Sequence, residues 1–484
     1  MNFSNRKVFA VVALATLAVL GHWNFWSHGI YALGFNTTAF WLGIAFLLWD
    51  NNPNLRWRQD WVWFVPLLLM ALSFSLFENP WLKMVSCVIL PAATSIFYAY
   101  SQLINARERF WGLQLLTALI KRSLVPLRLI GAAALFFRGV IARVFSLQDN
   151  HLCKRIISGL MLLIPISAIV LVLLASADEN FSRLLDKAGI HLFDFLNWSI
   201  IAKVFCIFMT CVLIFAGLHA WKDPYDYKEK ELSFDLDDVV IGIVMGGILL
   251  IYLVFLILQI DHMMLATLPQ SFEKTEQIVK SGFWQLFFLS VLNAGLFFTV
   301  YKNTGTAAQI ILRIFIVTSG LLLLSAAWRM GMYVYWYGLS YEKFFASYTT
   351  LFALGVFVYL VVASFAKVRK DVFCFIAFAA LWSYGVATVL PVEKIIFNTN
   401  VQLSQSKSSR VDLSELRMLS TDVLYDAKRH FLPNPPKVDF AAKTGLEREQ
   451  HNRWSRWAAR LERKYCQRNW YEKNLSLIAQ CPSK

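Results

Sequence analysis

The feature that most constrains this chain is a succession of long apolar segments. Crossing the hydrocarbon core of a bilayer takes about 20 predominantly apolar residues, and a helix satisfies its own backbone hydrogen bonds there. About eleven windows meet this requirement: 8–26, 31–49, 61–77, 81–100, 156–176, 199–218, 238–260, 282–301, 308–337, 344–366 and 372–391. We therefore predict an all-α polytopic membrane protein with about eleven transmembrane helices and a small soluble C-terminal segment.

The composition supports residence in lipid. Hydrophobic residues make up 58% of the chain and charged residues only 16%, whereas soluble domains carry about 25% charged residues. The basic start MNFSNRK and the apolar run after it are typical of a signal sequence, but no small-residue cleavage site follows before GHWNFW. We interpret the first window as a retained transmembrane helix.

The basic residues indicate an orientation, because Lys and Arg accumulate in short cytoplasmic loops. They are Arg6 and Lys7 before the first window, Arg56 and Arg58 after the second, and Lys367, Arg369 and Lys370 after the tenth. All of these positions fall on one side if the N-terminus is cytoplasmic. An odd number of helices then places the C-terminus outside.

Four parts follow from this pattern: the first four transmembrane helices (1–100), a basic amphipathic cytoplasmic segment (101–155), helices five to eleven (156–391) and a polar tail (392–484). Residues 101–155 combine apolar stretches with Arg and Lys at helical spacing. This pattern is typical of interfacial helices on anionic lipid headgroups, and equally of helices packed against the bundle. No base-reading motif accompanies the charge, so nucleic acid is not an expected partner.

The tail divides at the helix-breaking stretch LPNPPK. Its second part places Leu446, Trp454, Trp457, Leu461 and Tyr465 on one helical face, with Arg453, Arg456, Arg460 and Arg463 around them. Such a stripe is either a packing face or an interfacial helix that touches the outer leaflet. A tail outside the cell also offers a surface for an envelope protein partner.

The cysteines differ by location. Five lie in or beside apolar windows and suit apolar packing, whereas Cys466 and Cys481 lie in the tail. An oxidising compartment favours a disulfide between these two, with a chain-entropy stabilisation of about 3 kcal/mol. The Cys and His spacings match no zinc site, and we predict no metal and no cofactor.

Charges at membrane depth form the one site-like group. Arg329 interrupts the apolar stretch 321–338, where a charge costs roughly 2.5 kcal/mol or more. The topology places further polar and aromatic side chains at its depth: Asp178, Lys203, Asp261, His262, Tyr333 and Tyr337. Arg329 either pairs with Asp178 or reaches the outer surface, or these residues line an outward-facing cavity that binds an anionic headgroup or solute.

Catalytic motifs for phosphate, acyl, zinc or dinucleotide chemistry are not found, and no residue is nominated as catalytic. Membrane transferases can use a single acid or His in a hydrophilic cavity, so an enzyme stays among the candidate functions. Three functions remain: a transporter of a small solute or lipid, an envelope sensor or assembly factor that uses its tail, and an intramembrane transferase acting on a lipid-linked substrate.

Four segments carry a family resemblance: LLASADENFSRLL at 173–185, SGFWQLFFLSVLNAGLFF at 281–298, SAAWRMGMYVYWYGLSYEKFFA at 325–346, and FNTN with VDLSELRMLSTD within 397–422. The chain resembles an uncharacterised family of bacterial polytopic inner-membrane proteins, catalogued only as a domain of unknown function. The resemblance implies a bacterial inner-membrane protein, and it supplies no activity. The cysteine-bearing extension after Arg463 departs from it. The outside position of the tail, inferred from the basic residues, would then be periplasmic.

Overall fold

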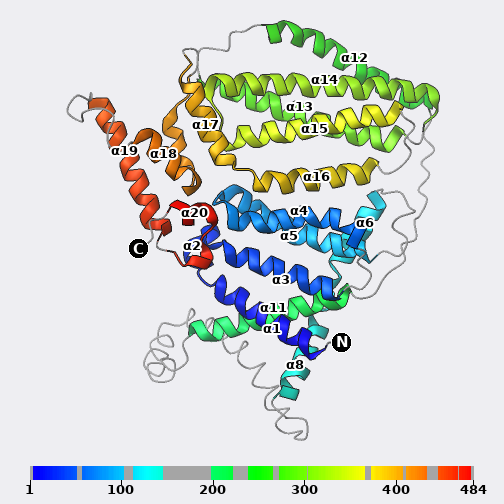
Figure 1. Cartoon of the computed structure of the whole chain (residues 1–484). Coiled ribbons are helices and arrows are strands. Elements are labelled where there is room, and N and C mark those ends of the chain that lie inside the picture. The colour runs from blue at the N-terminus through cyan, green and yellow to red at the C-terminus, as the bar shows by residue number, and fades with distance from the viewer. Residues whose placement is uncertain are drawn as a thin grey trace, which may run out of the picture.

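The computed structural model consists of helices joined by short connections, with no strand among the described residues (Figure 1). The described residues are 4–51, 57–102, 113–144, 198–221, 238–264, 272–301, 304–365, 372–406, 410–432, 445–466 and 468–480.

Six described helices are long and apolar enough to cross a membrane. They are α5 (Pro80–Ser101), α11 (Trp198–Ala220), α12 (Asp238–Met264), α13 (Phe272–Val300), α14 (Thr306–Tyr337) and α15 (Tyr341–Phe365). A seventh candidate is the pair α16 (Val372–Val389) and α17 (Val392–Ser404), which is bent by 69°. The apolar content and length of these helices identify a membrane protein.

The predicted count of about eleven transmembrane helices is not confirmed. Helices α1 (Asn5–Gly21), α3 (Phe35–Asn51) and α4 (Trp57–Leu76) lie over three further predicted windows. The first two have only 17 residues each, and the apolar part of α4 is Val62–Leu76. The window 156–176 lies outside the described residues.

The long helices pack side by side in one array (Figure 1). α14 contacts α12, α13 and α15, whereas α4 contacts α3, α5 and α16. The contact between α16 and α4 therefore joins the later helices to the earlier ones. Gly385 permits this close approach, since a Cβ there would lie 3.1 Å from the Cα of Pro66.

The basic segment contributes α6 (Leu113–Ser123), α7 (Val125–Arg128) and α8 (Ile130–Val144). α7 and α8 contact α11, with Ala133 fully buried and Phe136 packed edge-on against Phe215 at 5.3 Å. These contacts favour packing against the bundle over an interfacial position. Contact with anionic headgroups stays a prediction.

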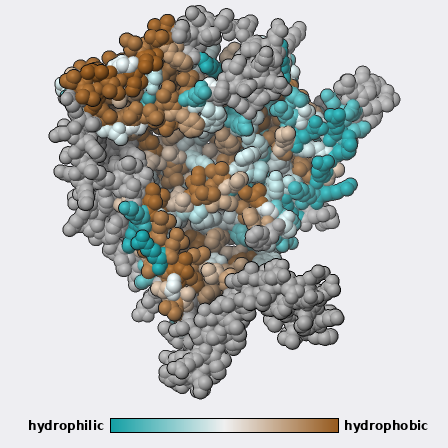
Figure 2. Space-filling view, turned by 180° about the vertical axis from the view of Figure 1, so that it is seen from behind, coloured by the Kyte–Doolittle hydropathy of each residue, from teal (hydrophilic) through white to brown (hydrophobic). Residues whose placement is uncertain are grey.

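The polar tail gathers at one end of the array, together with the short α2 (Phe25–His28) and η1 (Gly29–Ala32) (Figure 1). We call this the tail-side end. The tail elements after α17 are η4 (Leu413–Met418), η5 (Thr421–Val423), α18 (Leu424–Phe431), α19 (Gly445–Leu461), η7 (Glu462–Cys466), η8 (Trp470–Glu472) and α20 (Leu475–Gln480). Seen from behind, apolar side chains cover the flank that carries α12, and hydrophilic ones gather over the tail (Figure 2).

Candidate functional site at the tail-side end

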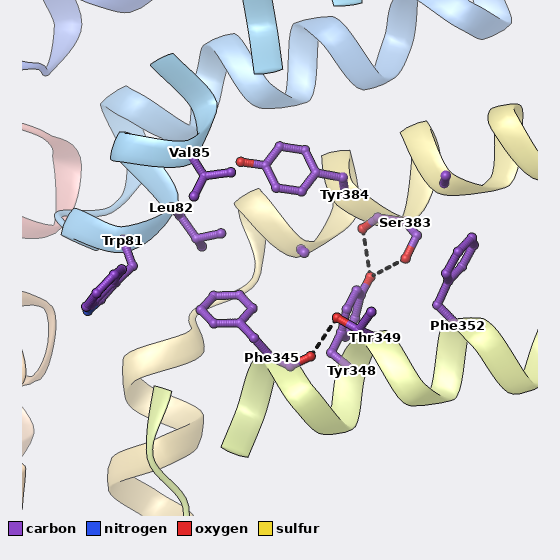
Figure 3. Close-up of a pocket in the computed structure, with 11 residues that line it drawn as sticks. Trp81, Leu82, Val85, Phe345, Tyr348, Thr349, Phe352, Ser383 and Tyr384 are labelled. Atoms are coloured by element: carbon purple, nitrogen blue, oxygen red, sulfur yellow. Dashed lines mark hydrogen bonds between the residues drawn. The ribbon is translucent and has the colours of Figure 1, made fainter. Parts of the chain in front are cut away.

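A lateral groove of about 330 Å³ opens between α5, α15 and α16 (Figure 3). Its walls come from the first turns of α5, the first half of α15 and the last turns of α16. Asn79 caps α5 by accepting a hydrogen bond from Leu82 N, and Pro80 occupies the first turn. This start fixes where Trp81, Leu82 and Val85 meet the groove.

Most side chains that line the groove are apolar, and its few polar groups already have hydrogen-bond partners. The Tyr348 hydroxyl donates to Ser383 O at 2.8 Å, and Thr349 donates to Phe345 O at 2.7 Å (Figure 3). The Tyr384 hydroxyl lies 3.0 Å from Ser86 Oγ. A ligand in this groove therefore meets methyl groups and rings, and gains from burial of its apolar surface.

A buried charged network begins next to the groove on α5 and is centred on Glu78, which is fully buried in the turn before α5. Lys83 Nζ lies 3.0 Å from Glu78 Oε2, and Arg468 Nη1 lies 2.9 Å from Glu78 Oε1. Asn474 also donates to Glu78 Oε2, and Lys83 donates to Leu33 O at 2.6 Å. Both cations are almost fully buried, so the pairing and hydrogen bonds offset their desolvation.

The network continues through the tail to α15. Asp422 accepts hydrogen bonds from Glu78 N at 2.9 and 3.0 Å, and its own N–H donates to Ser420 Oγ at 3.3 Å. Ser420 donates to Glu393 through its backbone N–H at 2.8 Å and its hydroxyl at 2.7 Å. Tyr341 donates to the other oxygen of Glu393. The groove and the network thus share α5 and α15, where Leu82 adjoins Lys83 and Phe345 lies one turn after Tyr341.

Residues near the C-terminus also contact the N-terminal part of the chain at the tail-side end. Glu472, fully buried, accepts from Asn24 at 2.6 Å and lies 3.3 Å from His28 Nδ1. Phe35 N donates to Lys473 O at 3.3 Å. Residues at the two ends of the sequence are therefore in direct contact, although more than 430 residues separate them.

Burial raises the pKa of Asp422 from its ordinary 3.8 to about 6. The hydrogen bonds from Glu78 N and Ser476 lower this pKa, but their effect is smaller than that of burial. The unfolded carboxyl, with a pKa near 3.9, loses its proton first as the pH rises. Between about pH 4 and pH 6 the folded state binds more protons, so the free energy of unfolding should fall with rising pH.

We expect Asp422→Asn to remove this part of the pH dependence, since the amide does not titrate and its oxygen can still accept a hydrogen bond. Denaturant unfolding of both proteins at pH 4, 5 and 6 measures it. If the free energy of unfolding of the variant falls with pH as steeply as that of the parent protein, the pH dependence does not come from Asp422.

The residues predicted at membrane depth are distributed over the array. Arg329 lies half-buried on α14, and a Cβ at Gly282 of α13 would lie 3.4 Å from its Nη1. Lys203 lies on α11 with its Nζ 5.0 Å from the ring centroid of Trp23. α11 packs against α1, α3, α7 and α8, whereas α14 packs against α12, α13 and α15. The structure therefore does not bring Lys203 and Arg329 together.

The other predicted members divide into two groups. Tyr333 and Tyr337 are buried neighbours on α14, with ring centroids 5.4 Å apart and Lys343 Nζ 4.2 Å from the Tyr333 ring. The side chains outside the described residues are those of Asp178, Asp261, His262 and Cys481. An Arg329–Asp178 cavity and a Cys466–Cys481 disulfide therefore stay predictions. Within the described residues, no group of three or more His, Cys, Asp or Glu side chains could hold a metal ion.

Sequence reasoning missed the network although one signal was present. Lys83 lies inside the predicted window 81–100. A charged side chain in an apolar window is costly unless it is paired, and this applies to Lys83 as it does to Arg329. The partner of Lys83 is Glu78, which falls in the short gap between the predicted windows 61–77 and 81–100. Arg468 and Asn474 carry no local signal, because they reach Glu78 only through the folding of the whole chain.

The span-length apolar helices and the lateral groove define a helical membrane protein. Residues 64–428 match the sequence family described as a domain of unknown function (DUF4153), and the chain belongs to that family. No curated protein matched the sequence, and no solved structure matched the fold. Glu78, Lys83, Glu393 and Asp422 lie inside the matched region, whereas Arg468, Glu472 and Asn474 lie beyond it.

Proposed function

We propose that this protein binds the hydrocarbon chain of a membrane lipid in the lateral groove and takes part in transport of that lipid. The observation that carries the proposal is the groove itself, an apolar recess bounded by span-length helices. Its volume lies at the lower end of the range of ligand pockets, about 300–1,000 Å³. Trp81 is 57% exposed and Val85 41% exposed at its edge, so the recess is open to the medium around the helices.

The chemistry of the lining favours a hydrocarbon chain over a polar solute. A polar solute buried there would lose water without gaining hydrogen bonds, because the hydroxyl groups of Tyr348 and Tyr384 already have partners. An acyl or isoprenoid chain enters from the bilayer with no such loss. The adjoining buried network holds the first turns of α5 and α15 at a fixed separation, which supports a preformed groove.

The membrane and the orientation belong to the same proposal. We infer a bacterial inner membrane, with a cytoplasmic N-terminus and the tail-side end in the periplasm, from the positions of the basic loops. In that orientation the groove lies in the outer half of the bilayer. A Cys466–Cys481 disulfide would then form in an oxidising compartment.

Filling the groove should displace the lipid. Ala380 lines the groove and is exposed, so Ala380→Phe places a ring in the recess without disturbing a packed core. We expect the lipid-bound fraction of the detergent-purified protein, measured by native mass spectrometry, to fall about tenfold, which corresponds to about 1.4 kcal/mol.

The matched control is Ala307→Phe, which adds the same ring at an exposed alanine of α14 away from the groove. The control should keep its lipid, and both variants should unfold at the temperature of the parent protein. Equal lipid retention by the two folded variants would rule out the groove as the binding site.

A further inference from the structure

The tail helix α19 and the turn η7 that follows it carry an arginine stripe, which we define as Arg453, Arg456 and Arg460 of α19 and Arg463 of η7. The spacing of three and four residues places the first three side chains on one face of α19, and Arg463 follows three residues later. All four are exposed, and they extend over about 15 Å of helix. The stripe is a concentrated positive surface on the outermost helix of the tail (Figure 1).

The apolar face of α19 packs against other elements of the tail. Trp454 stacks on Phe431 with ring centroids 4.1 Å apart, and Trp457 Nε1 donates to Arg417 O at 2.7 Å. An interfacial membrane helix buries its apolar face in lipid. That face of α19 is buried against α18 and η4 instead, which argues against insertion into the outer leaflet.

Among the described residues, acidic side chains pair with only one member of the stripe, Arg453. Glu449 pairs with Arg453 one turn away, and Glu462 pairs with Lys428 of α18. Within the described residues, no carboxylate forms an ion pair with Arg456, Arg460 or Arg463. Their guanidinium groups remain available for bidentate contacts with carboxylates.

Two exposed side chains with apolar surface lie on η4 and α18, the elements that pack against α19. Met418 is 86% exposed and follows Arg417, whose guanidinium lies 5.9 Å from the Trp454 ring centroid. Tyr425, 62% exposed, lies on α18, which packs against α19. Arg, Tyr and Met are enriched at protein interfaces, and exposed apolar side chains contribute little to binding of a purely charged polymer.

We propose that the arginine stripe, with Met418 and Tyr425, docks an acidic amphipathic segment of a partner protein on the tail side of the membrane. The stripe supplies charge complementarity to Asp or Glu, and the two apolar side chains contact the apolar residues of that segment. α19 lies at the outer edge of the tail (Figure 1), and hydrophilic side chains gather over the tail (Figure 2).

The test uses the full-length protein in nanodiscs and a fluorescent synthetic helix that has a glutamate face and a leucine face. We expect Arg456→Glu with Arg460→Glu to weaken binding of this peptide at least about tenfold. The matched control, Lys394→Glu with Arg410→Glu, reverses two exposed basic residues elsewhere in the tail and should leave binding unchanged. Equal weakening by the control would overturn the assignment to the stripe.

A second comparison separates a protein partner from other anions. A peptide of the same charge with serine in place of leucine should bind about tenfold more weakly to the parent protein, and Met418→Ser should reduce that difference. The proposal is wrong if polyphosphate, phosphatidylglycerol vesicles or the serine peptide bind as tightly as the leucine peptide. A folded Ala380→Phe protein should bind the peptide normally, so failure of the lipid proposal would be seen separately.

Discussion

Replacing Glu78 with alanine should destabilise the folded protein by about 3–5 kcal/mol, because it leaves Lys83 and Arg468 buried without their counter-charge. Asn474 would also lose its acceptor. The loss exceeds that of a surface ion pair, since neither cation can recover its hydration while the end of the chain stays docked. Denaturant or thermal unfolding in a defined detergent measures the effect.

A control substitution at an exposed acidic residue shows whether the loss of stability comes from the burial of the ion pairs or only from the loss of a negative charge. Glu415 lies exposed on η4, and Glu415→Ala should change stability by less than about 0.5 kcal/mol. A double-mutant cycle of Glu78→Gln and Lys83→Met should show a coupling energy of about 1–3 kcal/mol. Additive effects of those two substitutions would mean that the pair does not act as a unit in the folded protein.

The second large effect is expected at Gly34, where the N-terminal part of the chain meets the C-terminal extension. A Cβ at this position would lie 2.3 Å from Lys473 O and 2.4 Å from Glu472 O, and both atoms belong to the backbone. Backbone cannot move aside as a flexible side chain can. Gly34→Ala should therefore cost about 1–3 kcal/mol or release the extension from the bundle.

Hydrogen exchange of residues 470–480 reports this release, because the docked segment is protected by its contacts. We expect faster exchange there in Gly34→Ala, with unchanged exchange in α13 and α14. Gly331→Ala is the control, since a Cβ at Gly331 meets no atom within 4 Å. Protection of 470–480 equal to that of the parent protein would show that the close approach at Gly34 is not needed for docking.

Much of the helical fold could be predicted from apolar length alone. The windows 238–260 and 344–366 correspond to α12 and α15 within a few residues, because lipid-spanning helices carry their signal locally. The first two windows differ from α1 and α3 at both ends, since hydropathy does not reveal that α1 ends at Gly21 or that α3 begins at Phe35. Periodicity also predicted the apolar face of α19 around Trp454, and the structure decides between the two interpretations by packing this face against the tail.

The groove and the network were not predictable in the same way. Trp81, Phe345 and Ala380 look like ordinary members of three apolar helices, and only the order of packing places them around one recess. Glu78 and Arg468 lie in short polar stretches, and their pairing spans 390 residues. Long-range pairing of this kind depends on the whole topology and leaves no local periodicity.

Photo-crosslinking with a phospholipid that carries a diazirine near the end of one acyl chain would locate the bound hydrocarbon chain. We expect enrichment of label in the groove segments 81–85 and 345–352 over the exposed apolar face of α12, around Ile243 and Ile251, and loss of that enrichment in Ala380→Phe. Label spread evenly over exposed apolar residues of α12 and the groove would contradict a lipid-binding site.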